Sequence, residues 1–279
     1  MGRATGARDR GTARGRGARL AGPVGEDAAV DLEPRIGAAP AAYVAEIVTR
    51  TRDVLGGDLL AVCLMGSAAL GDYRPGRSDI DVAVVAGRPL PVVAREALVA
   101  ALEHETLPCP ARGLELVAYD PTGLADPRGP AYLINLNTGP RMERQVSFDP
   151  AASPQFWFTL DVAIGRTLGR GLLGPPPAEL FPELPDALVR GAARDSLDWW
   201  SAHGGHPFRA VLAACVAWRW AETGTWSSKG AAARWAAERA PDPDVLLAAL
   251  DRREGDGTRA FDEAAGRRFV ALVRDELAD

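Results

Sequence analysis

Two aspartates at the start of an apolar segment are the residues of this sequence with the clearest capacity for chemistry. Asp79 and Asp81 open the segment 79–85, which reads Asp-Ile-Asp-Val-Ala-Val-Val. Alternate residues of a strand face the same side, so both carboxylates project together while Ile80 turns into the core. Close carboxylates repel each other unless a cation neutralises them, and hard oxygen ligands suit Mg²⁺ held together with substrate phosphates. The spacing therefore predicts that Asp79 and Asp81 bind magnesium.

A third carboxylate, Glu115, lies between Leu114 and Leu116 in a strand-like stretch. In a strand it points to the face opposite its apolar neighbours. If this strand pairs beside the segment 79–85, Glu115 joins the two aspartates on one sheet face. Three clustered acids are costly without metal, so the arrangement predicts two divalent ions bridging a triphosphate. Phosphoryl or nucleotidyl transfer is the reaction class that follows.

Gly66 and Ser67 follow the apolar run 59–65 and complete the pattern G-S-x11-D-x-D. Glycine lets the backbone come close to a ligand, and free N–H groups and a hydroxyl at a strand-to-helix turn can hold phosphate oxygens. Each part alone has a plain structural reading, because a D-x-D pair is often a solvated sheet face and a lone glutamate an exposed strand residue. Their combination in order, with apolar segments on both sides, favours a catalytic site.

The elements that must position these residues fall into two halves. Residues 31–152 alternate between helical and strand periods, with helices expected near 41–55 and 92–103 and strands near 59–65, 79–85, 114–119 and 140–149. After residue 153 the strand signals end. Helices are expected near 154–168, 186–201, 208–222, 228–239, 243–252 and 259–277. The predicted fold class is α+β: a mixed sheet with flanking helices, followed by an all-helical domain over 153–279.

Length and composition exclude several classes of protein. The 279 residues suffice for two domains, and 47% hydrophobic with 25% charged residues is ordinary globular usage. Residues 1–20 hold six arginines and one aspartate, so residues 1–30 are expected to be a disordered basic tail. The rest of the chain therefore carries a net charge more negative than the −5 of the whole chain. An acidic body argues against a nucleic-acid partner. No apolar run approaches the roughly 18 residues that span a membrane. We expect a cytoplasmic monomer with reduced cysteines.

Two sets of motifs resemble known families. The pattern from Gly66 to Asp81 resembles the active-site motif of the DNA polymerase β-like nucleotidyltransferases. The segments 171–181, 217–229 and 235–239 resemble the helical domain of the streptomycin/spectinomycin adenylyltransferases, and the similarity extends over about residues 40–275. The chain is thus similar to an aminoglycoside nucleotidyltransferase, with a nucleotidyltransferase domain over 31–152 and a helical substrate-binding domain over 153–279.

The resemblance implies transfer of AMP from ATP to an antibiotic hydroxyl, with Mg²⁺ as cofactor and ATP as co-substrate, in a cleft between the two domains. It implies that Ser67 and Ser78 contact the triphosphate, that Asp79 and Asp81 bind magnesium, and that Glu115 is the general base. Lys229, the only lysine of the chain, is expected to reach the phosphates from the helical domain.

The acceptor site is less defined by the resemblance. The related enzymes that use streptomycin have a basic residue where this chain has Val216, and Arg219 is expected to replace it at the nucleotide. A polycationic drug is recognised by carboxylates and aromatic faces. The expected acceptor contacts are Trp200, Asp198, Asp161 and His206.

Two alternatives remain open at this point. One is a nucleotidyltransferase with a non-antibiotic acceptor, either a small metabolite or a protein hydroxyl. The other is a non-catalytic nucleotide-binding partner protein, against which the long helical half argues.

Overall fold

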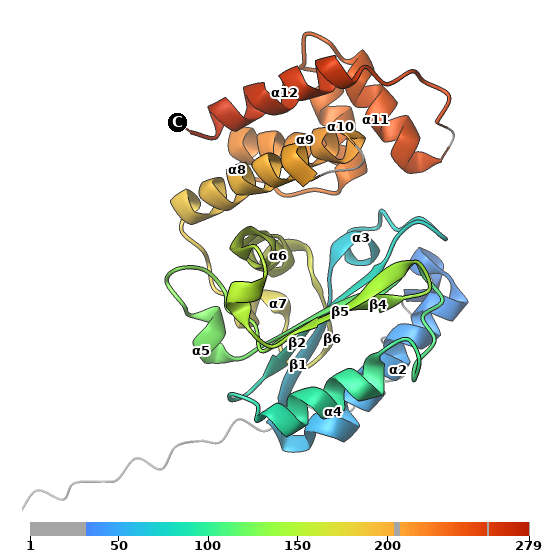
Figure 1. Ribbon diagram of the computed structural model, residues 1–279, viewed down its shortest axis with the longest axis vertical. Helices are drawn as coiled ribbons and strands as arrows, with labels where there is room; N and C mark the ends of the chain where they lie inside the picture. The colour runs from blue at the N-terminus through green and yellow to red at the C-terminus, as the bar shows by residue number, and fades with distance from the viewer. Residues whose placement is uncertain (1–31, 204–206, 256, 279) are drawn as a thin grey trace, which may run out of the picture.

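The computed structural model describes residues 32–203, 207–255 and 257–278. It places a sheet with its covering helices below a bundle of helices (Figure 1). The predicted basic tail over 1–30 and His206 lie outside the described residues, so the expectations for them stay predictions. The α+β class and the division into a sheet-bearing half and a helical half are confirmed.

The sheet has six strands in the order β5-β4-β3-β2-β1-β6. Only β2 and β3 pair in parallel, and the other neighbours are antiparallel. The sheet is therefore mixed, as predicted. The strands are β1 (Leu59–Leu64), β2 (Ile80–Ala86), β3 (Leu114–Tyr119), β4 (Ile134–Gly139), β5 (Met142–Ser147) and β6 (Arg170–Leu173).

Both faces of the central strands are covered, which explains why β1 and β2 read as nearly continuous apolar runs. The helices α2 (Ala38–Leu55) and α4 (Val92–Leu102) pack on one face, on side chains such as Val82 and Leu116. The helix α6 (Gln155–Leu168) packs on the other, where Phe158 and Val162 meet Ala83 and Val85. Asp81 and Glu115 alternate onto this α6 face, beside the helical bundle.

The bundle has its own apolar core of mostly alanine, leucine and valine side chains. Short residues such as Ala214 and Ala233 let the helices approach closely, and both are fully buried. Its helices are α8 (Asp186–His203), α9 (Pro207–Thr223), α10 (Lys229–Ala237), α11 (Asp244–Glu254) and α12 (Glu263–Glu276). Short helical elements connect the rest of the chain: η1 (Gly56–Asp58), α3 (Gly66–Ala69), α5 (Pro121–Leu124), η2 (Pro150–Ala152) and α7 (Pro177–Leu180).

Two strands depart from the sequence-based expectation. The strand expected near 140–149 is present as β5, but it is the second arm of a hairpin whose first arm, β4, was not expected and ends at Gly139 with φ 159°. The strand β6 lies in the half expected to be wholly helical, and it pairs with β1. With α6 packed on the sheet as well, the sheet-bearing unit extends past residue 153 and the separate bundle begins at α8.

The three cysteines are free and buried, in agreement with reduced thiols. Among the helices of the described chain, none combines the length and the apolar character that crossing a membrane requires.

Candidate active site

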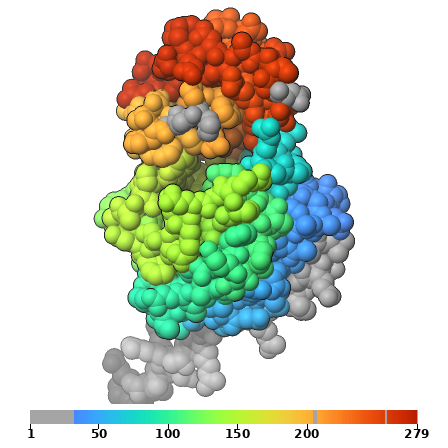
Figure 2. All heavy atoms as spheres, turned by 45° about the vertical axis from the view of Figure 1, so that its right-hand side comes forward, coloured from blue at the N-terminus to red at the C-terminus, as the bar shows by residue number. Residues whose placement is uncertain are grey.

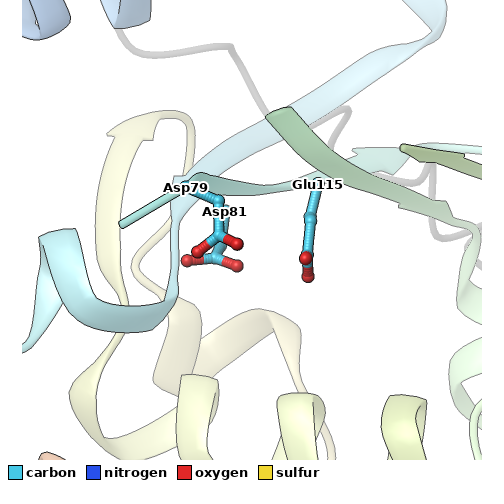
Figure 3. A group of neighbouring side chains, drawn as sticks. All are labelled: Asp79, Asp81 and Glu115. Atoms are coloured by element: carbon cyan, nitrogen blue, oxygen red, sulfur yellow. The ribbon is translucent and has the colours of Figure 1, made fainter. Parts of the chain in front are cut away.

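The three predicted carboxylates lie together on the α6 face of the sheet. Asp81 of β2 and Glu115 of β3 are register partners in the parallel pair. Asp79 precedes β2 directly, and one carboxylate oxygen from each of the three residues lies within 4.8 Å of the others. Figure 3 shows Asp79 and Asp81 side by side, with Glu115 pointing off the sheet in the same direction. The expected convergence is therefore present.

The turn from β1 into α3 presses against this cluster. The Met65 N–H donates to the Asp81 carbonyl at 2.8 Å. Gly66 follows with φ 56°, and a Cβ at this position would lie 1.9 Å from Oδ2 of Asp81. Only glycine permits this conformation and this close approach. Gly66 therefore lets the turn pack against the Asp81 carboxylate, and its predicted close approach to a ligand stays a prediction.

The two serines of the motif differ in their surroundings. The hydroxyl of Ser67 is buried and has no hydrogen-bond partner among the described residues. A buried polar atom without a partner is uncommon in a finished core, so this hydroxyl is available for a ligand. The hydroxyl of Ser78 accepts from the Arg74 N–H at 3.0 Å and closes the turn before Asp79. Its predicted contact with a triphosphate stays a prediction.

The carboxylates perturb one another strongly. Burial, Asp79 and Asp161 together raise the pKa of Glu115 to about 8, against the opposing charge of Arg112. Burial, then Asp79 and Glu115, raise the pKa of Asp81 well above its usual range. Asp79 itself is paired with Arg112 at 2.5 Å. Such a group of competing acids is stabilised by a bound cation.

Basic side chains of the bundle lie near the acid cluster. Figure 2 shows that the surface is hollowed between the bundle and the sheet. Lys229 is the first residue of α10, and its positive charge opposes the rise in the pKa values of Asp81 and Asp161. Arg209 of α9 interacts electrostatically with Asp79 and Glu115. Burial and the charge of Arg112 nonetheless lower the pKa of Arg209. The cleft thus holds the acid cluster and Arg112 on its sheet side, and Lys229 and Arg209 on its helical side.

Asp161 belongs to this site. It lies on α6 and remains accessible to water. The surrounding protein still removes enough solvent to raise its pKa to about 7, although Lys229 acts in the opposite direction. Its charge reaches Asp81 and Glu115. The structure therefore brings this predicted acceptor or nucleotide contact next to the acid cluster.

Asp198 and Trp200, the other predicted acceptor contacts within the described residues, make contacts with other side chains. Asp198 is committed elsewhere: Arg274 of α12 donates to its two carboxylate oxygens at 2.5 and 3.2 Å. Figure 1 shows α12 on the far side of the bundle from the sheet. The ion pair with Arg274 occupies the Asp198 carboxylate that was expected to contact the acceptor. Trp200 stacks edge-on against Trp157 of α6 at 5.7 Å between ring centroids, where the bundle meets the sheet-bearing unit.

Arg219 is placed on α9, and its carbonyl accepts from the Thr223 hydroxyl at 2.7 Å. Its proposed contact with the nucleotide stays a prediction.

Two basic site residues were missed by the sequence analysis. Arg112 stands three positions before Glu115, and Arg209 stands two positions after the first residue of α9. Their nearness to the acids depends on the loop before β3 and on how α9 lies over the sheet. A basic residue just before an acid-bearing strand is a weak signal for the first, and the sequence holds none for the second.

The donor set fits a divalent cation with a phosphate ligand. Three carboxylates supply hard oxygen atoms within mutual reach, and the buried Ser67 hydroxyl, next in the chain to Gly66, has no partner among the described residues. A divalent cation bound there would offset the burial and the mutual repulsion that raise the pKa values of Asp81 and Glu115.

Comparison with known proteins agrees with this arrangement. Residues 45–120 match the family model described as a nucleotidyltransferase domain, and residues 179–276 match that of the aminoglycoside adenylyltransferase C-terminal domain. An aminoglycoside (3'')(9) adenylyltransferase of Shigella flexneri is 31% identical over 261 residues, covering 85% of this chain and 97% of the relative. A spectinomycin 9-adenylyltransferase of Staphylococcus aureus is 26% identical, covering 72% of this chain and 80% of the relative.

A solved structure shares the fold. It is that of the spectinomycin adenyltransferase AAD(9) from Enterococcus faecialis with ATP and spectinomycin, at a TM-score of 0.65 and 18% identity. The match covers 85% of this chain and 99% of the other.

Proposed function

Because the chain belongs to the aminoglycoside adenylyltransferase family and is a nucleotidyltransferase, we propose that it transfers AMP from ATP to a hydroxyl of an antibiotic of the spectinomycin or streptomycin type. The observation that carries the proposal is the meeting of Asp79, Asp81 and Glu115 within 4.8 Å at the domain boundary. The similarity to relatives named for this reaction, over nearly their whole length, supports the choice of acceptor.

In this proposal the three acids bind the metal ion that holds the nucleotide. Asp79, Asp81 and Glu115 are the residues that would hold Mg²⁺, which supplies positive charge to the triphosphate when bound. The Ser67 hydroxyl, free in its buried position, donates to a phosphate oxygen. Lys229 adds its charge from α10, on the side opposite the acids. Ser78 and Arg219 are assigned to the triphosphate as well.

Glu115 is the proposed general base. Burial, the largest cause of its raised pKa, makes it a stronger proton acceptor than an exposed carboxylate. The Glu115 carboxylate takes the proton of the acceptor hydroxyl as the hydroxyl oxygen attacks the α-phosphorus in line. The bond between the α-phosphorus and the bridging oxygen breaks, and pyrophosphate leaves. The charges of Lys229 and Arg209 face the leaving group's negative charge.

The acceptor is proposed to bind beside α6 and the end of α8. Asp161 offers a carboxylate that remains accessible to water there. Trp157 and Trp200, 5.7 Å apart, offer aromatic surface. Carboxylates and aromatic faces are the groups that recognise the ammonium or guanidinium of such antibiotics. His206 is proposed as a further contact from the segment before α9.

The enzyme is proposed to act as a monomer, on small molecules rather than nucleic acid, in the cytoplasm, where ATP is abundant. The net charge of −5 disfavours a phosphate backbone as partner. Gel filtration with light scattering tests the monomer.

The testing experiment is pyrophosphate release from ATP by the purified protein with Mg²⁺ and a panel of aminocyclitols and aminoglycosides. The proposal predicts release that requires both metal and spectinomycin or streptomycin. A protein that binds ATP but releases pyrophosphate with no member of the panel contradicts the proposed acceptor. A protein that does not bind ATP contradicts the proposed chemistry.

A further inference from the structure

The segment between the two halves of the acid motif is held by the other domain. Residues 71–78 connect α3, which carries Ser67, with Asp79 at the start of β2. This segment lies against α10 and α11 of the bundle. Its Asp72 is only 8% exposed, although it is charged. A buried carboxylate outside the acid cluster requires partners, and the structure provides them.

Asp72 accepts three hydrogen bonds from the bundle. Its Oδ2 accepts from the Arg253 guanidinium at 2.8 Å and from the Gly230 N–H at 3.2 Å. Its carbonyl accepts from the same guanidinium at 3.1 Å. Burial alone raises the pKa of Asp72, but the hydrogen bond and charge of Arg253 and the Gly230 N–H outweigh burial, and the net pKa is lowered. Asp72 is therefore ionised and fully engaged.

The bond to Gly230 joins the two domains at the start of α10. Gly230 is the second residue of this helix, and its N–H is one of the first-turn donors that a helix leaves without an internal partner. A helix N-terminus favours a negative charge, so the Asp72 carboxylate caps α10 from the other domain. Lys229 is the preceding residue. The carboxylate thus fixes the backbone from which Lys229 reaches the acid cluster.

Glycine at 230 is adapted to this contact. A Cβ there would lie 3.3 Å from Oδ1 and 3.5 Å from Oδ2 of Asp72, closer than ordinary packing for the first oxygen. Around this contact runs a second set of bonds. Glu254 forms an ion pair with Arg74 at 2.8 Å and a second ion pair with Arg234. Arg77 donates hydrogen bonds to the carbonyls of Arg252 and Gly255 at the end of α11. These outer pairs are more exposed and contribute little by themselves.

We infer that Asp72 is a positioning residue: it ties the first turn of α10 to the segment that leads into Asp79 and thereby sets Lys229 against the acid cluster. The inference rests on the proposed function for the role of Lys229 in holding phosphates. Among the described residues, Asp72 forms no hydrogen bond with the acids of the cluster or with Lys229, so it acts through the backbone of residue 230 and through Arg253. The alternative is a purely structural pair that stabilises the domain contact without affecting the site.

Amide hydrogen exchange tests the tether without any nucleotide. The variants are Asp72→Ala, the conservative Asp72→Asn, and Asp58→Ala as a matched control, because Asp58 pairs with Arg88 on the exposed rim of the same sheet unit. Peptides that cover 228–237 are expected to exchange faster in Asp72→Ala and at the wild-type rate in Asp58→Ala. Asp72→Asn keeps an oxygen for the Gly230 N–H and is expected to retain most of the protection. Unchanged exchange in Asp72→Ala overturns the inference.

A double-mutant cycle on Mg²⁺-ATP binding tests the effect on Lys229. Asp72→Ala is expected to weaken binding by about tenfold in the wild-type background and by less than about twofold in the Lys229→Ala background, because residues that act as a unit are not additive. Asp72→Asn is expected to remain within about threefold of wild type. Equal losses in both backgrounds mean a purely structural role and overturn the inference.

The two proposals fail in distinguishable ways. If the wild type binds ATP but modifies no acceptor, the proposed function falls while the cycle is still measured on binding. If the cycle is additive while antibiotics are modified, the positioning role falls and the proposed function stands.

Discussion

Asp81 and Glu115 are direct neighbours across the one parallel strand pair of the described sheet, β2 with β3. Parallel strands place the side chains of register partners on the same face, so this pairing carries the two carboxylates to one side. Asp79, two residues before Asp81, joins them. The pairing of Asp81 with Glu115 is therefore built by a backbone relationship, and the β1–α3 turn adds the close approach of Gly66.

Replacing Glu115 by glutamine separates binding from turnover. The amide keeps the shape of the side chain but cannot accept the proton of the attacking hydroxyl. We expect turnover to fall by about two to four powers of ten with antibiotic affinity close to wild type, and Mg²⁺-ATP affinity to fall much less than turnover, because only one of the three metal-holding carboxylates loses its charge. Steady-state pyrophosphate release and calorimetric titration measure the two quantities. An undiminished rate places the base elsewhere.

Asp81→Asn is expected to act on binding instead. The substitution removes a metal-binding charge, so Mg²⁺-dependent affinity for ATP falls while metal-independent affinity changes little. Titrations of ATP with Mg²⁺ and with EDTA measure the difference. Wild-type affinity in the presence of Mg²⁺ contradicts the metal-binding role of Asp81.

Gly66→Ala tests the close approach of the β1–α3 turn. The added Cβ lies 1.9 Å from Asp81 Oδ2 at a φ of 56°, so we expect a loss of about 1–3 kcal/mol in the free energy of unfolding together with loss of Mg²⁺-ATP binding. Gly191→Ala is the matched control, because a Cβ there meets no atom within 4 Å and alanine favours the interior of α8. Urea unfolding measures the stability of both variants, and calorimetric titration measures their Mg²⁺-ATP binding. A Gly66→Ala variant as stable and as active as wild type contradicts this geometry.

The metal-free protein is expected to lose stability as the pH rises. An unfolded glutamate titrates near about 4.3, whereas the folded Glu115 has a pKa of about 8. Between these values the folded state binds more protons than the unfolded state, so the free energy of unfolding falls with rising pH. Urea unfolding in EDTA at pH 5 and pH 8 measures this fall, and Mg²⁺ is expected to reduce it.

Glu115→Gln provides the control for this pH dependence. Glutamine does not titrate, so the variant is expected to show a shallower fall and to exceed the wild type in stability at pH 8 in EDTA. An identical pH dependence in both proteins means that Glu115 is not the titrating group.

Asp198→Ala and Asp161→Asn test the acceptor site as a pair. Asp198 is bound to Arg274 on the outer side of the bundle, so its removal is expected to leave the antibiotic KM unchanged. Asp161 lies beside the acids, and its neutralisation is expected to raise that KM about tenfold or more, because a cationic group loses its partner. The reverse order of effects contradicts this placement of the acceptor.

The acid cluster was predictable from sequence because it depends on local rules. The i, i+2 alternation places Asp79 and Asp81 together, and the apolar neighbours of Glu115 fix its face. The central strands were predictable because their apolar runs are long. The strand β6 was not, since Arg170–Leu173 has four residues, includes a glycine and shows no alternation. It forms because β1 offers a free edge.

The residues missed by the sequence analysis depend on long-range packing. Asp72 meets Gly230 and Arg253 at separations of 158 and 181 positions. No local pattern marks such pairs. For the same reason, Asp198 reads as a free carboxylate in the sequence although Arg274, on another helix, occupies it.

Mass spectrometry of the antibiotics tests the central claim most directly. Spectinomycin and streptomycin are incubated with ATP, Mg²⁺ and either the wild type or Glu115→Gln, and the molecular masses of the products are measured. The account predicts an added mass of one AMP on at least one antibiotic with the wild type, and only a trace with Glu115→Gln. No added mass with the wild type, or equal amounts of product with both proteins, contradicts it.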